Sequence, residues 1–171
     1  MCERNGDTIV LVDAVVSTPP DSTGRALTDA RERGLPIEIH ERPPARSVTE
    51  AAASLGLEPD GIVKSLVVRR GAGDYLFAML PANKSLSWPL LRAAAGANRM
   101  SLPDAEDALA VTGYERGTIS PIGCSAPWPV FLDTSVAARI AIGCGSRQHS
   151  ALIDRDAFVA AYGVTVTPLS E

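Results

Sequence analysis

The stretch Thr112–Gly123 reads TGYERGTISPIG and places three glycines and one proline within twelve residues. Glycine tolerates a positive φ and the close approach of another backbone, whereas proline fixes φ and lacks an N–H donor. Gly117–Pro121 is therefore expected to form a shaped loop with free N–H groups at Thr118, Ile119 and Ser120. Such a loop can hydrogen-bond an anion or a carbonyl oxygen. On local sequence alone, a surface turn is the commoner explanation.

Length and composition indicate one ordinary globular domain. The 171 residues, 46% hydrophobic and 21% charged, suffice for a single core without staples. No apolar run approaches the roughly 20 residues of a membrane span, and the N-terminal residues are a poor secretory signal. Three widely spaced cysteines favour free thiols in a reducing compartment. These features predict a cytoplasmic protein, and they leave its oligomeric state open.

The charge balance limits the kind of nucleic-acid contact that the chain can make. The formal net charge is −4, which argues against the extended basic surface of a protein that coats nucleic acids. Local contact with the end of an RNA stays possible, and Lys64, Lys84 and Arg92 are candidates for it.

Periodicity and cap signals predict strand pairs mixed with single helices. Strands are expected at 35–41, 61–69, 75–80, 128–133, 139–143, 151–153 and 164–166, and helices at 25–33, 48–55, 86–95, 104–111 and 155–161. The apolar run 8–12 is either a short strand or part of an extended arm. Residues 1–25 are interpreted as an N-terminal extension and 26–171 as the main domain. Because the order departs from regular βαβ alternation, we expect an α+β domain with a mixed, barrel-like β-sheet flanked by helices.

Lys64 is the unusual residue of the strand at 61–69. Alternation puts it on the same face as the apolar side chains of Ile62, Leu66 and Val68. A lysine in such a place either snorkels at the strand end or finds a partner or an opening for its ammonium. Lys64, the loop 117–121 and a second glycine loop at 143–149 are therefore candidates for one pocket.

Thiol and metal chemistry are weaker candidates. Cys124 and Cys144 can in principle be nucleophiles, but only His149 lies near in sequence, and small buried cysteines are usually inert. Cys144 and His149 provide two metal ligands, whereas a zinc site needs three or four.

Three further side chains have a functional and a structural interpretation. Asp133 can hydrogen-bond the pocket loop, although an aspartate at a strand end more often caps a turn. Trp88 and Trp128 can stack on the terminal adenine of an RNA. Core or rim packing is the commoner role for tryptophan.

Four segments together resemble the YbaK-type aminoacyl-tRNA deacylases, the free-standing relatives of the editing domain inserted in bacterial prolyl-tRNA synthetase. The segments are TEAAASLG at 49–56, IVKSLV at 62–67, the glycine loop at 112–123 and VFLD at 130–133. The resemblance covers roughly residues 35–162 in one order. The strand lysine, the Gly-x-x-x-Pro loop and the later Gly-x-Gly loop are fairly specific as a set.

The resemblance implies hydrolysis of the ester that joins a wrong amino acid, such as cysteine or alanine, to a tRNA such as tRNA(Pro). Lys64 would bind the 3′-adenosine end or polarise the ester, and backbone N–H groups of the loop would bind the substrate carbonyl. No side-chain nucleophile, metal or cofactor is implied; water or a group on the substrate attacks. The implied catalytic residues are Lys64, Gly117, Thr118, Ile119, Ser120 and Pro121. The implied substrate-binding residues are Tyr114, Gly143, Gly145, Ser146 and His149.

The resemblance makes the acceptor end of aminoacyl-tRNA the expected partner, with a synthetase as a possible second one. A binding module that holds an aminoacyl-adenosine, a nucleotide or a tRNA end without chemistry is the alternative. A third possibility is a regulatory or interaction protein in which residues 1–25 carry the function and the domain is a scaffold.

Overall fold

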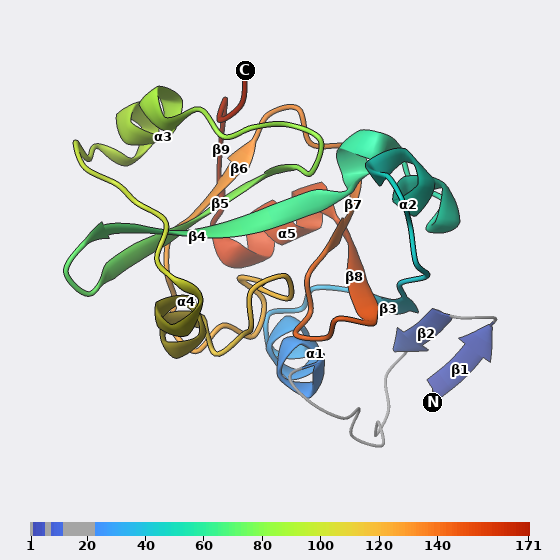
Figure 1. Ribbon diagram of the computed structural model, residues 1–171. Helices are drawn as coiled ribbons and strands as arrows, with labels where there is room; N and C mark the ends of the chain where they lie inside the picture. Colours follow the sequence, from blue (N-terminus) through green and yellow to red (C-terminus); the bar gives the residue numbers. More distant parts are fainter. Residues whose placement is uncertain (1, 6–7, 12–22) are drawn as a thin grey trace.

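Two β-sheets form the centre of the fold, and helices pack around them (Figure 1). The computed structural model describes residues 2–5, 8–11 and 23–171. The first sheet has the strand order β1 (Cys2–Asn5), β2 (Thr8–Leu11), β3 (Glu38–Glu41), β8 (His149–Asp154), β7 (Arg139–Ile142). The second has the order β4 (Val63–Gly71), β5 (Asp74–Pro81), β6 (Val130–Asp133), β9 (Thr165–Thr167).

The predicted α+β class with a mixed sheet is confirmed. β6 pairs in parallel with β5 and with β9, whereas the other strand pairs are antiparallel. An isolated parallel bridge between Ile62 and Ala141 joins the two sheets beside β4 and β7. The arrangement is barrel-like in that the sheets meet along this line, but it is not a closed barrel.

All five predicted helices are present. They are α1 (Thr23–Glu32), α2 (Val48–Ser54), α3 (Trp88–Ala95), α4 (Ala105–Thr112) and α5 (Arg155–Tyr162). α2 begins as its sequence predicts, because the Glu50 N–H donates to the Ser47 hydroxyl at 3.1 Å. The Glu50 carboxylate in turn accepts from the Arg46 N–H at 2.8 Å, one residue earlier than in a standard capping box.

The strands predicted at 61–69 and 75–80 are confirmed as β4 and β5, which pair as an antiparallel hairpin, whereas the strand expected at 35–41 is shorter. Strand β3 begins only at Glu38. Pro36 has no N–H for a ladder, and the Leu35 N–H bonds back to the Ala30 carbonyl at the end of α1. Leu35 and Ile37 are nevertheless buried, so this segment joins the core without joining the sheet.

Strand β4 divides two hydrophobic cores. Val63 and Val67 belong to the larger core, which includes residues of both sheets, α1 and α5. Val68 belongs to a smaller core beneath α3, against which Leu66 also packs. The alternation that the sequence predicts for this strand therefore holds from Val63 to Val68, and Lys64 lies on the face of the smaller core.

The N-terminal region contributes to the first sheet and to the larger core. β2 pairs with β3, and α1 runs across residue 25 and buries Ala26, Leu27 and Ala30 in the larger core. The proposed boundary between 1–25 and 26–171 stays a prediction; Val12, in the apolar run 8–12, and the rest of that segment to residue 22 lie outside the described residues. None of the helices in the described part of the chain has the length and apolar character that crossing a bilayer requires.

Candidate functional site

The structure brings the two glycine loops of the sequence into direct contact. The Gly145 N–H donates to the Thr118 carbonyl at 3.0 Å. A Cβ at Gly143 would lie 2.6 Å from the Ile119 carbonyl oxygen and 2.8 Å from that of Thr118. Side chains do not tolerate such distances to backbone atoms, so only glycine allows the loop after β7 to approach this closely.

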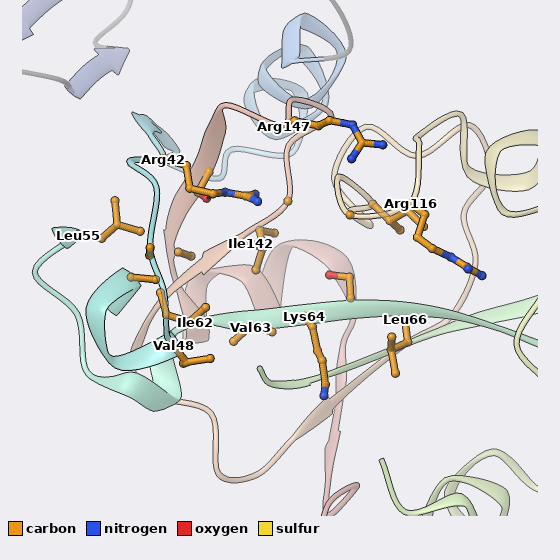
Figure 2. A pocket seen from close by; sticks show the side chains of 18 of the residues that line it. Arg42, Val48, Leu55, Ile62, Val63, Lys64, Leu66, Arg116, Ile142 and Arg147 are labelled. Atoms are coloured by element: carbon orange, nitrogen blue, oxygen red, sulfur yellow. Dashed lines mark hydrogen bonds between the residues drawn. The ribbon is translucent and has the colours of Figure 1, made fainter. Parts of the chain in front are cut away.

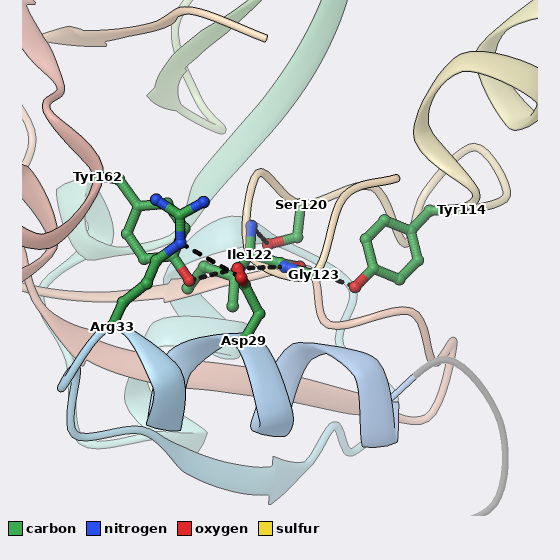
Figure 3. A network of polar contacts seen from close by, with 7 residues as sticks. All are labelled: Asp29, Arg33, Tyr114, Ser120, Ile122, Gly123 and Tyr162. Atoms are coloured by element: carbon green, nitrogen blue, oxygen red, sulfur yellow. Dashed lines mark hydrogen bonds and ion pairs between the residues drawn. The ribbon is translucent and has the colours of Figure 1, made fainter. Parts of the chain in front are cut away.

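Hydrogen bonds hold the loop 112–123 from its rear, the side that faces α1 and α5 (Figure 3). The buried Tyr114 hydroxyl donates to the Ile122 carbonyl at 2.7 Å, and the Ile122 N–H donates to the Ser120 hydroxyl at 3.1 Å. Burial raises the pKa of Tyr114 to about 12, so its hydroxyl stays a donor. Gly123 has a φ of +73°, which glycine adopts without strain.

Asp29 of α1 is the centre of this rear network. Its Oδ2 accepts from the Gly123 N–H at 2.8 Å and from the Tyr162 hydroxyl at 2.6 Å, and its Oδ1 accepts from Arg33 at 3.2 Å. Burial alone would raise the pKa of this carboxyl, but the hydrogen bonds from Tyr162, Gly123 and Arg33 outweigh it and lower the pKa below 3.8. The loop is thus tied to a charged acceptor on α1.

The front of the loop 112–123, the side turned away from α1 and α5, differs from the prediction at one position. The Thr118 N–H is not free, because it closes a four-residue turn by donating to the Glu115 carbonyl at 2.9 Å. Gly117, third in that turn, has a φ of +91°, as a type II turn requires. Among the described residues, none accepts from the Ile119 and Ser120 N–H groups. Two of the three predicted donors therefore remain available.

A cavity of ≈ 830 Å³ lies between these loops, β4 and the segment that leads into α2 (Figure 2). Its lining comes from parts of residues 42–55, 62–67, 102–108, 116–119 and 141–150. Five lining side chains are basic, namely Lys64 and four arginines, whereas no acidic residue of the described chain lines it. In a chain of net charge −4, this is a strong local excess of positive charge.

Lys64 lines the cavity, but its ammonium turns away from the two glycine loops. The Nζ donates to the carbonyl of Lys84, in the turn after β5. In Figure 2 the ammonium lies on the other side of β4 from Ile142 and Arg42. The sequence left two possibilities for Lys64: snorkelling at the strand end, or a partner for its ammonium. The ammonium has a partner, and the stem of the side chain lies along a strand that borders the cavity.

Ser65, the next residue on β4, has a hydroxyl that lacks a partner. Its Oγ is buried and forms no hydrogen bond with the described residues, and the residue lines the cavity. A buried hydroxyl without a partner is costly, so this atom is suited to bond a ligand in the cavity.

The model of the aminoacyl-tRNA editing domain family matches residues 42–160, which include all five cavity segments. The chain belongs to this family.

Relatives of the editing domain include free-standing and inserted forms. Over 103 residues the chain is 32% identical to an Enterococcus faecalis protein named "Putative Cys-tRNA(Pro)/Cys-tRNA(Cys) deacylase EbsC", covering 59% of this chain and 63% of that protein. It is 33% identical over 97 residues to the proline–tRNA ligase of Thermosipho melanesiensis, covering 57% of this chain but 16% of the ligase. The chain thus matches less than two thirds of the length of each.

The fold of the editing domain recurs in solved structures. A crystal structure titled "putative trans-editing enzyme for prolyl tRNA synthetase" superposes with a TM-score of 0.78 at 25% identity. The superposition covers 91% of this chain and 99% of that chain. The predicted YbaK-like fold is therefore confirmed.

The predicted site residues of the editing domain fall into two groups. Lys64, Gly117, Ile119 and Gly143 line the cavity. The others lie outside its lining: they are Tyr114, Thr118, Ser120, Pro121, Gly145, Ser146 and His149. The catalytic and binding roles of both groups stay predictions. His149 Nδ1 and Ser146 Oγ are 2.9 Å apart, which holds the second loop together.

Sequence reasoning missed the arginines of the cavity. Arg42, Arg46, Arg116 and Arg147 come from three separate loops. No spacing pattern connects them, so only the fold could reveal that they surround one space. Lys84 and Arg92, which the sequence offered for RNA contact, do not line the cavity.

The cysteines, the possible metal ligands and the tryptophans that the sequence offered lie in surroundings that favour a structural role. Burial raises the pKa of both Cys124 and Cys144, which disfavours the nucleophilic thiolate. No group of three potential ligands among His, Cys, Asp and Glu is close enough to hold a metal in the described part of the chain. Trp128 packs against Tyr75 with ring centroids 5.3 Å apart, and Trp88 packs against the smaller core.

Asp133 caps a turn, and it also binds a distant segment. Its Oδ1 accepts from the Ser135 N–H at 2.9 Å, the usual role of a strand-end aspartate. Its Oδ2 accepts from the N–H groups of Leu169 and Ser170 at 2.7 and 2.8 Å. Burial would raise the pKa of this carboxyl, but the hydrogen bonds from Ser135, Leu169 and Ser170 prevail and lower it below 3.8.

Proposed function

We propose that this protein hydrolyses the ester bond of mischarged aminoacyl-tRNA in trans. The observation that carries the proposal is the cavity in which two glycine loops meet over β4, with Ile119, whose N–H bonds no described acceptor, on one wall and basic side chains around it. The relative named for deacylation of Cys-tRNA(Pro) and Cys-tRNA(Cys) supports the substrate class. A cytoplasmic location and contact with a synthetase follow from that role.

The proposed reaction needs positioning more than a strong nucleophile. Water attacks the ester carbonyl, the carbonyl oxygen becomes an oxyanion, and the N–H groups of Ile119 and Ser120 donate to it. The C–O bond to the ribose then breaks, and the ribose oxygen takes one of the two protons of the water. The other proton passes to solvent, and the amino acid leaves as a carboxylate. One well-placed oxyanion donor contributes on the order of 10²–10³-fold in rate.

Lys64 acts in this mechanism by exchanging its partner. Its ammonium leaves the Lys84 carbonyl and binds the 3′-terminal adenosine or the ester oxygen. A hydrogen bond from a charged ammonium contributes about 1.5–3 kcal/mol, and a substrate oxygen that replaces the carbonyl forms a bond of the same kind, so the exchange itself costs little. The long, flexible stem of lysine allows that movement.

Deacylation of a panel of mischarged tRNAs tests the proposal. The panel carries Ala, Cys, Ser and Thr on tRNA(Pro), with the cognate tRNAs as controls. We expect release of one amino acid above the spontaneous rate, reduced at least about 100-fold by Lys64→Ala while that variant stays folded. Lys84→Ala is the matched control, since it keeps the carbonyl that Lys64 contacts. Full activity of Lys64→Ala would rule out the mechanism.

A binding module without chemistry is the second candidate. The direction of the Lys64 ammonium, away from the loops, favours it, because the cavity can then hold an aminoacyl end with no cation at the ester. Such a module would slow the spontaneous hydrolysis of a mischarged tRNA. The panel separates the two functions by the sign of the change in hydrolysis rate.

A further inference from the structure

The arginines of the cavity lie around one opening and come from separate parts of the chain. Figure 2 shows Arg42, Arg116 and Arg147 spread in an arc on the side of the cavity opposite β4. Arg42 follows β3, Arg116 belongs to the loop after α4, and Arg147 belongs to the loop after β7. All three are exposed, and each lines the cavity.

Among the described residues, the hydrogen-bond partners of Arg42 and Arg116 are neutral, so neither charge is paired with a carboxylate there. Arg42 Nε donates to the Ser150 hydroxyl at 3.2 Å, and Arg116 donates to the Pro103 carbonyl at 3.0 Å. These neutral acceptors hold each guanidinium without cancelling its charge. Arg147 differs, because it pairs with the exposed Glu115 at 3.3 Å.

Several arginines elsewhere in the chain have carboxylate partners. Arg33, Arg70, Arg139 and Arg155 each form an ion pair, at distances between 2.8 and 3.2 Å. The cavity combines four arginines with no acidic lining residue among those described. Guanidinium groups held in place with unused N–H donors are suited to phosphate, which they can bind with two hydrogen bonds.

We infer that Arg42 and Arg116 form a clamp for the phosphodiester groups of the single-stranded acceptor end of an RNA. The inference rests on the proposed function and adds the site that holds the strand while its terminal ester lies in the cavity. The expected ligand is a strand with several phosphates, because the two side chains approach the cavity from different loops. One phosphate would leave one of them without a partner.

Binding of an uncharged acceptor minihelix ending in CCA tests the clamp independently of activity. We expect Arg42→Gln and Arg116→Gln each to raise the Kd roughly tenfold. Each should also reduce the slope of log Kd against log salt by about 0.7, the value for one phosphate contact on a single strand. Arg99→Gln is the matched control, since Arg99 is exposed and lies outside the cavity lining.

Turnover separates the clamp from the ester chemistry. With aminoacyl-tRNA the two variants should raise KM and leave kcat unchanged. With an aminoacyl-adenosine that lacks phosphates, the variants and the wild type should react equally. Wild-type deacylation with unchanged KM, Kd and salt slope in both variants would overturn the clamp alone.

Two other outcomes have clear meanings. If the wild type deacylates no tRNA but binds the minihelix through both arginines, the proposed function fails and the clamp stands. If AMP and the minihelix bind with the same Kd, the ligand is a mononucleotide and the clamp for an RNA strand is overturned.

Discussion

The front and the rear of the loop 112–123 use their polar groups in opposite ways. At the rear, Tyr114, Ser120 and Gly123 all take part in hydrogen bonds within the protein. At the front, the N–H groups of Ile119 and Ser120 bond no acceptor among the described residues. Donors that face a reacting group are most effective when the protein holds them in place beforehand. The difference indicates that the hydrogen bonds at the rear hold the loop in a shape that leaves the front N–H groups free to bond a ligand.

The front can be broken by adding one methyl group. Gly143→Ala introduces a Cβ 2.6 Å from the Ile119 carbonyl oxygen, so the second loop must push the first out of position. We expect deacylation to fall by about 10²–10³-fold, the effect of losing an oxyanion donor. Gly71→Ala is the control, because its Cβ would meet nothing closer than 3.8 Å. Equal activity of both variants would show that the close contact of the loops is dispensable.

The rear can be broken at Asp29. Asp29→Ala removes the acceptor of the Gly123 N–H and of the Tyr162 hydroxyl. We expect the free energy of unfolding in urea to fall by about 1–3 kcal/mol, since the carboxylate is partly solvated. Activity should fall roughly tenfold and recover in part in Asp29→Asn, whose amide oxygen still accepts. Asp156→Ala, at an exposed ion pair, serves as the control; an identical loss there would contradict the tether.

Lowering the pH has the smallest and most specific of the expected effects, a change in the free energy of unfolding. The folded-state pKa of Asp29 is lowered below 3.8, so its ionised form stabilises the fold above that pH. This contribution is lost as the pH falls through the lower, folded-state pKa. The difference in unfolding free energy between wild type and Asp29→Asn should therefore be constant above about pH 5 and shrink below 3.8. A difference that grows in acid would mean that the carboxylate is not stabilised by its partners.

The sequence predicted features that depend on neighbouring residues. The β4 and β5 strands, the start of α2 at Val48 and the face of Lys64 all follow from local rules of alternation and capping. The sequence analysis expected a free N–H at Thr118, but its hydrogen bond could have been predicted, because Gly117 occupies the third position of a turn that Glu115 begins.

Features that join distant segments could not be predicted. The Lys84 carbonyl beside Lys64 depends on the exact path of the turn after β5. The arc of arginines depends on three loops that no spacing relates. The tether from Asp29 to Gly123 spans 94 positions of the sequence and contains no motif. Each requires the tertiary arrangement, which pattern rules for single segments do not contain.

The carboxylate of Asp133 imposes an order on folding during synthesis. Its partners Leu169 and Ser170 follow it by 36 and 37 positions. Strand β9, which completes the second sheet beside β6, lies in sequence between Asp133 and these partners. At roughly 5–20 residues per second, the ribosome adds those partners about 2–7 s after Asp133. Until then β6 has an open edge and a carboxylate with unfilled acceptor sites. A nascent chain that stops before residue 165 therefore exposes this edge to other chains.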